Sequence, residues 1–113
     1  MLHLKKMTII LNNSMYLNGE PLYREILKKA YELDIAGGTA SECIEGFGAN
    51  TRLKKKTIAR INNVAPVRVE IVDTPEKLAL LMPFLEQHLT KGIITMGDVE
   101  VLKFTRDRVI QDQ

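Results

Sequence analysis

The sequence predicts an α+β domain in which two strand–helix–strand units form one antiparallel sheet with both helices on one face. Two observations carry this prediction. Apolar and polar residues alternate over 6–12 and 66–73, a period of two that is typical of half-buried strands. Each of these stretches is followed along the chain by a segment whose apolar residues recur every three or four positions, as on one face of a helix.

The length and composition favour a single ordinary globular domain. The chain has 113 residues, so we expect one domain over 1–113. A net charge of +2 is too small to argue for nucleic acid. No apolar run is long enough to span a bilayer, and Lys5 and Lys6 interrupt the only N-terminal run that resembles a signal peptide. We therefore expect that the protein is not inserted in a membrane. The single Cys43 excludes an intramolecular disulfide and a cysteine-cluster zinc site, so we expect the reducing cytoplasm as its compartment.

The first half of the chain predicts a strand, a helix and a second strand. Residues 18–19 have turn chemistry, and Pro21 suits the first turn of a helix. We expect glycines 37–38 to end that helix by supplying left-handed residues, and a second strand to run over 39–47. The inward positions of the helix are Leu22, Ile26, Ala30 and Leu33.

The second half repeats this order. The stretch 66–73 is the clearest strand, and Asp-Thr-Pro-Glu at 73–76 is typical of a helix start. Pro83 predicts a bend or restart within that helix. Two short strands, 93–95 and 99–104, are expected before a polar tail over 105–113. The buried stripe of the helix is Leu78, Leu81, Leu85 and Leu89.

This order of elements predicts a ferredoxin-like βαββαβ sandwich, an antiparallel sheet with two helices on one face. The other face of the sheet must be covered or be unusually polar. Its apolar residues, Ile10 and Val72 among them, favour cover by a symmetric partner.

A long segment over about 49–65 separates the two halves, and a segment of that length is functional or disordered. Gly46-Phe47-Gly48 before it reads either as a turn facing a ligand or as a tight turn whose phenylalanine plugs a subunit interface. The segment is either an arm that binds a partner, a membrane or nucleic acid, or a solvated face. No aromatic residue interleaves its charges, which argues against base stacking. The residues of this partner-binding arm are Asn50, Arg52, Lys54, Lys55, Lys56 and Arg60.

Metal binding and catalysis find little support. His3 and His88 lie far apart and share no ligand spacing. Glu42, Glu45 and Glu70 are the candidate acid–base carboxylates, but no nucleophile pattern accompanies them. We therefore expect no metal site and no enzyme.

Several blocks of sequence, spread from about Leu4 to Phe104, resemble the domain of unknown function 190 (DUF190) family, which is related to the PII nitrogen-regulatory signalling proteins. The resemblance implies a PII-like fold, a cyclic homotrimer and a T-loop that corresponds to about 49–65. The blocks are Pro21-Leu22-Tyr23, Ala36-Gly37-Gly38-Thr39, Ile44-Glu45-Gly46-Phe47-Gly48-Ala49, Val69-Glu70-Ile71-Val72-Asp73 and Gly97-Asp98-Val99-Glu100-Val101.

PII proteins bind adenine nucleotides in clefts between subunits, and the resemblance assigns roles to particular residues here. Thr39, Glu70 and Val72 match positions around the adenine. Gly46, Phe47 and Gly48 match the glycine-rich base of the T-loop. Lys103 matches an arginine that reaches the phosphates, and Lys91 is a second candidate because a lysine can hold a phosphate as a point charge.

The sequence also departs from the PII pattern. Ala49 and Asn50 replace an arginine and a glutamine, and that glutamine helps PII proteins bind magnesium and 2-oxoglutarate. Residues 89–92 replace the glycine-rich phosphate loop. Glu42 and Cys43 stand where an arginine and a glycine are common in the DUF190 family. An acid in place of a base near the cleft could weaken the binding of anionic ligands.

The function expected from the sequence is non-catalytic signal transduction. A small anionic effector, an adenine nucleotide such as ATP, ADP, AMP or cyclic AMP, would bind between subunits of a homotrimer. The T-loop would then signal to a partner protein, and a membrane transporter or channel is the kind that PII proteins often regulate. The alternatives are a constitutive trimeric adaptor without a small-molecule ligand and, third, an enzyme on the same scaffold.

Overall fold

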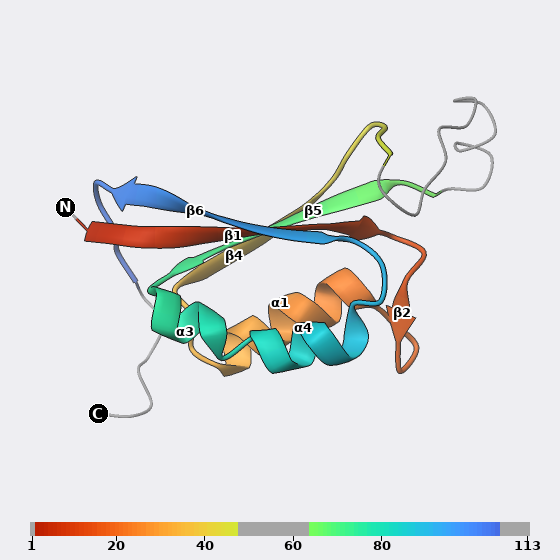
Figure 1. Ribbon diagram of the computed structural model, residues 1–113, viewed down its shortest axis with the longest axis horizontal. Coiled ribbons are helices and arrows are strands. Elements are labelled where there is room, and N and C mark those ends of the chain that lie inside the picture. The colour runs from red at the N-terminus through yellow and green to blue at the C-terminus, as the bar shows by residue number, and fades with distance from the viewer. Residues whose placement is uncertain (1, 48–63, 107–113) are drawn as a thin grey trace.

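The computed structural model describes residues 2–47 and 64–106, which form one sheet with a helical layer on one side (Figure 1). The strands are β1 (Leu2–Asn12), β2 (Tyr16–Leu17), β3 (Glu20–Pro21), β4 (Gly37–Glu42), β5 (Pro66–Asp73) and β6 (Ile93–Val101). The helices are α1 (Leu22–Glu32), α3 (Pro75–Ala79) and α4 (Met82–His88).

The main sheet has the strand order β4-β5-β1-β6, and each neighbouring pair is antiparallel. The helices lie on one face of it (Figure 1). This is the ferredoxin-like α+β arrangement, so the predicted fold class is confirmed. The two edges of the sheet are β4 and β6, which therefore lie on opposite sides of the central pair β5-β1.

The core lies between the sheet and the helices. Met7, Ile9 and Leu11 of β1 are buried and alternate with more exposed neighbours, as the period of two predicted. Ile9 is completely buried and pairs in register with Val69 of β5 and Ile94 of β6. Each such side chain contributes roughly 1.5–3 kcal/mol relative to an exposed one. Two of the predicted stripe residues, Leu33 and Leu89, are only partly buried. The others are buried: Leu22, Ile26, Ala30, Leu78, Leu81 and Leu85.

The break predicted at Pro83 is confirmed, because α3 and α4 are separate helices. Pro83 lies in the first turn of α4, where its missing N–H costs no helical hydrogen bond. The turn predicted at 18–19 is confirmed as well. Asn18 and Gly19 have φ values of 53° and 84°, and they close the hairpin of β2 and β3, which the sequence did not predict.

Three predicted boundaries are wrong. The second predicted strand, β4, begins at Gly37 and ends at Glu42 instead of running over 39–47. The left-handed residue after α1 is Asp34, with a φ of 61°, and neither Gly37 nor Gly38 has a positive φ. The last strand is continuous from Ile93 to Val101, because β1 pairs with it through Gly97 and Asp98.

The two predicted irregular segments are described only in part. Val64 and Ala65 precede β5, and Asn13 holds Ala65 through two hydrogen bonds of 3.0 Å. In the tail, Arg106 pairs with Asp34 beyond the end of α1. The partner-binding arm predicted at Asn50, Arg52, Lys54, Lys55, Lys56 and Arg60 lies outside the described residues, as do 107–113. None of the described helices is long and apolar enough to cross a bilayer.

Candidate functional site

The face of the sheet opposite the helices, which we call the open face, carries the clearest set of candidate binding residues. Thr39 of β4 is the register partner of Glu70 of β5, and Glu70 is in turn the partner of Thr8 on β1. Thr8 pairs with Thr95 of β6, which completes a polar row across all four strands. Residues in register share a face, so the period of two that buries Val69 and Ile71 places this row on the open face.

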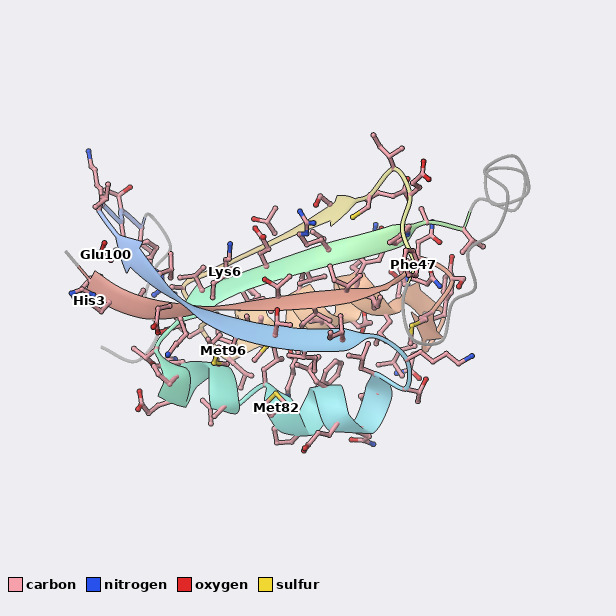
Figure 2. The ribbon with its side chains drawn as sticks, turned by 45° about the horizontal axis from the view of Figure 1, so that its top comes forward. His3, Lys6, Phe47, Met82, Met96 and Glu100 are labelled. Carbon is pink, nitrogen blue, oxygen red and sulfur yellow. The ribbon has the colours of Figure 1, made fainter. Side chains whose placement is uncertain are left out.

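Glu70 is the only acidic residue on the open face of the described strands. Lys6 of β1 lies beside it, with 3.6 Å between the lysine Nζ and the Glu70 Oε2. Both side chains are part-exposed, at 44% for Lys6 and 40% for Glu70. Figure 2 shows Lys6 on the side of the sheet that faces away from the helices. The alternation of residues 6–12 places Lys6 on this face, but no sequence motif marks it as a site residue.

Val72 lies next to this row. Its register partners are Gly37 on β4 and Lys6 on β1, and Lys6 pairs on its other side with Gly97. A Cβ atom at either glycine would meet no atom within 4 Å. The open face therefore has free space at both edges beside the polar row, and packing within the chain does not require glycine at either position. Thr39, Glu70 and Val72, the predicted adenine-side residues, are thus together in one small area.

The predicted glycine-rich turn lies at the end of the sheet away from His3 and Glu100 (Figure 2). Phe47 is 73% exposed, and Gly46 lies against the ring of Pro66, where a Cβ would come within 3.3 Å of the proline Cγ. Gly46 does not have a positive φ, so its glycine suits close packing rather than a left-handed conformation. Gly48 lies outside the described residues.

The two predicted phosphate ligands flank opposite ends of β6. Lys91 precedes β6 and Lys103 follows it, so the length of this strand separates them. Both are exposed. Because β6 and β4 are opposite edges of the sheet, the two central strands separate Lys91 from Thr39. Lys103 directly precedes the tail residues 104–106, which line one hollow together with Gly37 and Gly38 at the start of β4, so the tail of the same chain passes near Thr39.

The three glutamates considered for acid–base chemistry are not on one surface. Glu42 pairs with Val67 and so faces the helix side of the sheet, where its Oε2 accepts a hydrogen bond of 3.1 Å from the Asn13 Nδ2. Glu70 lies on the open face, and Glu45 follows the end of β4. Within the described ranges, no three His, Cys, Asp or Glu side chains are placed to hold a metal ion.

Two hollows lie outside the polar row, and the second reaches Gly37 and Gly38, which directly precede Thr39. The first, of about 520 Å³, lies where β1 begins and β6 ends, and His3, Lys5, Pro75 and Asp98 are among the residues that line it. Lys5 donates a hydrogen bond to Asp98, and this bond together with the lysine charge lowers the pKa of that carboxyl below its ordinary value of 3.8. The second, of about 680 Å³, lies between the end of α1, the start of β4 and the tail that ends in Arg106. Sequence periodicity could not have predicted either hollow, because each joins segments distant along the chain.

Comparison with known proteins identifies the relatives of this chain. The model of the DUF190 family, described as "Uncharacterized ACR, COG1993", matches residues 4–101. A UPF0166 protein from Aquifex aeolicus (strain VF5) is 33% identical over 100 residues, which cover 87% of this chain and 92% of the relative.

Among solved structures, the fold is similar to that of CPII from Thiomonas intermedia K12. Its complex with ADP and bicarbonate has a TM-score of 0.60 and 21% identity, covering 90% of this chain and 91% of the other. A structure of CPII, a nitrogen regulatory PII-like protein, bound to ADP, AMP and bicarbonate has a TM-score of 0.61 and 16% identity, covering 88% and 96%.

Proposed function

Since the chain belongs to the DUF190 family, we propose that it is a PII-like regulatory protein that binds a small anionic effector without transforming it. The effector is an adenine nucleotide. The observation that carries the proposal is the register pair Thr39–Glu70 on the open face, beside the free space at Gly37. The similar fold of CPII, solved with ADP bound, supports it.

The binding site forms between subunits of a homotrimer acting in the cytoplasm. One subunit supplies Thr39, Glu70 and Val72 for the base, and Gly46 and Gly48 for backbone contacts. Lys91 takes a phosphate from a neighbouring copy, because it precedes β6, the opposite edge of its own sheet. Lys103, just before the tail residues that lie near the start of β4, is the second phosphate ligand. A second copy also supplies the cover that a part-apolar open face needs, since Ile93 on this face is 56% exposed.

The segment 49–65 carries the signal to a partner protein. It starts directly beyond Gly46 and Phe47 and returns to β5 at Ala65, which Asn13 anchors. An effector bound beside Gly46 therefore contacts the base of this segment. The effector switches the protein only if it binds one state of the segment more tightly than another. A membrane transporter or channel is the partner class that the PII relationship favours.

A thermal-shift panel tests the effector. Purified protein is mixed with ATP, ADP, AMP, cyclic AMP, 2-oxoglutarate or bicarbonate, with and without magnesium. A nucleotide at 100 times its dissociation constant adds about 2.7 kcal/mol to the free energy of unfolding, and the melting temperature rises by several degrees. Thr39→Val, which keeps the shape of the side chain but removes its hydroxyl, reduces the shift.

The readout for the signal is hydrogen exchange over 49–65, compared with and without the nucleotide that gives a shift. Altered exchange in this segment supports signalling through it. Absence of any nucleotide shift contradicts the proposal and favours the constitutive trimeric adaptor. In that case partner binding depends on the charges of the segment, weakens with added salt and ignores nucleotide.

A further inference from the structure

We infer that Lys6 is a positioning residue that sets the nucleotide selectivity of the site by holding and neutralising the Glu70 carboxylate. This inference rests on the proposed function. Lys6 and Glu70 come from the two central strands β1 and β5, and both point away from the helices. Their 3.6 Å separation makes them an ion pair without a hydrogen bond.

The distance leaves the carboxylate available to a ligand. An ionised carboxylate can accept about four hydrogen bonds, and the described residues donate none to Glu70. Lys6 therefore balances the negative charge of Glu70 without occupying its acceptor positions. A lone carboxylate at this position would repel an anionic nucleotide, whereas the pair presents acceptor oxygens with no net charge.

The open acceptor distinguishes the two purines. Adenine carries an exocyclic amine that donates hydrogen bonds, and guanine carries a carbonyl oxygen at the equivalent position. A carboxylate can also accept from the N1–H and 2-amino groups of guanine, so Glu70 favours adenine only while it stays fixed at the place that the adenine amine occupies, where guanine would put its carbonyl oxygen. Lys6 supplies that restraint. Its register neighbours on this face are Val72 and Gly97, so no other side chain in its own row carries a charge.

Arg68 provides a matched control. It lies two residues from Glu70 along β5, on the same open face, and pairs in register with Ile10 and Ser41. The structure records no ion pair between Arg68 and another described residue. Removing Arg68 thus removes the same unit of positive charge from the same face, but leaves the contact of Lys6 with Glu70 intact.

The experiment compares the affinities of ADP and GDP for wild-type protein, Lys6→Met, Lys6→Arg and Arg68→Met by calorimetry, with the oligomeric state checked by light scattering. Lys6→Met is expected to lower ADP affinity roughly tenfold and to reduce the ADP-to-GDP affinity ratio by a similar factor. Lys6→Arg, which keeps the charge, restores the ratio to within about threefold of wild type. Arg68→Met leaves the ratio unchanged.

Several results would overturn the inference. One is an unchanged ratio in Lys6→Met. Another is an equal loss in Arg68→Met, since the effect would then be general attraction of anions. Loss of the assembly in both Lys6→Met and a second variant, Lys6→Gln, would show that the lysine acts at a subunit contact instead. If wild-type protein binds neither nucleotide, the proposed function fails as well, which separates that case from failure of the Lys6 role alone.

Discussion

Thr39 at the edge of the sheet is the register partner of Glu70 on the neighbouring inner strand, on the face that no helix covers. A hydroxyl and a carboxylate are thereby fixed next to each other by backbone pairing. Both strands are paired with each other in the sheet, so both groups are held in place before any ligand arrives. Lys91, one of the two cations proposed for phosphate, precedes the opposite edge strand β6, so one chain does not bring all of the proposed residues together.

The first prediction concerns the centre of the core. Ile9→Ala should lower the free energy of unfolding by about 2–5 kcal/mol, because Ile9 is completely buried between Val69 and Ile94 and leaves a cavity when truncated. Urea unfolding followed by circular dichroism measures the change. Leu80→Ala is the control, since Leu80 is 54% exposed, and a loss there as large as at Ile9 would contradict the described core.

The second prediction concerns the start of α3. The Thr74 hydroxyl accepts a hydrogen bond of 3.2 Å from the Lys77 N–H and caps the helix. Thr74→Ala should reduce stability by about 0.5–2 kcal/mol, because it leaves that N–H without its partner. Thr74→Ser keeps the hydroxyl and should recover most of the loss in the same unfolding measurement. Equal losses in both variants would show that the methyl group matters more than the cap.

The third prediction uses two glycines with opposite surroundings. Gly92 has a φ of 138°, and an added Cβ would lie 2.5 Å from the backbone oxygen of Ile10, whereas Gly37 has open space around it. Gly92→Ala should therefore cost more than the roughly 1–3 kcal/mol of a strained backbone position. Gly37→Ala should leave the melting temperature nearly unchanged. Tolerance of alanine at both sites would contradict the described turn before β6.

Local sequence patterns correctly predicted those strands and helices whose buried side or end is marked by their own residues. The alternation of Val67, Val69 and Ile71 defined β5 correctly, and Pro83 marked the break between α3 and α4. The glycines at 37 and 97 led to wrong predicted boundaries, because both residues lie within strands. Gly37 pairs with Val72 of β5, and Gly97 pairs with Lys6 of β1. A single-sequence pattern contains no information about such pairing.

For the candidate site as well, the sequence predicted several of the residues but not the contacts between distant segments. The family resemblance named Thr39, Glu70 and Val72, and the structure brings all three together. It also brings Lys6 to Glu70, although 63 residues of chain lie between them; the contact depends on the register of β1 against β5. Register is set by the whole sheet, so periodicity alone could place Lys6 on the correct face but could not give it a partner.

The last prediction concerns pH and the pair formed by Lys5 and Asp98, which lies on the helix side of the sheet where β1 begins and β6 ends. The Lys5 hydrogen bond and charge hold the pKa of Asp98 below its ordinary value of 3.8. A lowered pKa in the folded state means that the pair stabilises the fold above 3.8 and loses this effect as the pH falls through the lowered pKa. Asp98→Asn should therefore lower the melting temperature slightly at pH 7 and leave it unchanged well below pH 3.8. Asp98 is highly exposed, so added salt should shrink the difference at neutral pH. Glu86→Gln, on the exposed side of α4, is the matched control, and an equal effect there would show that net charge rather than the pair is responsible.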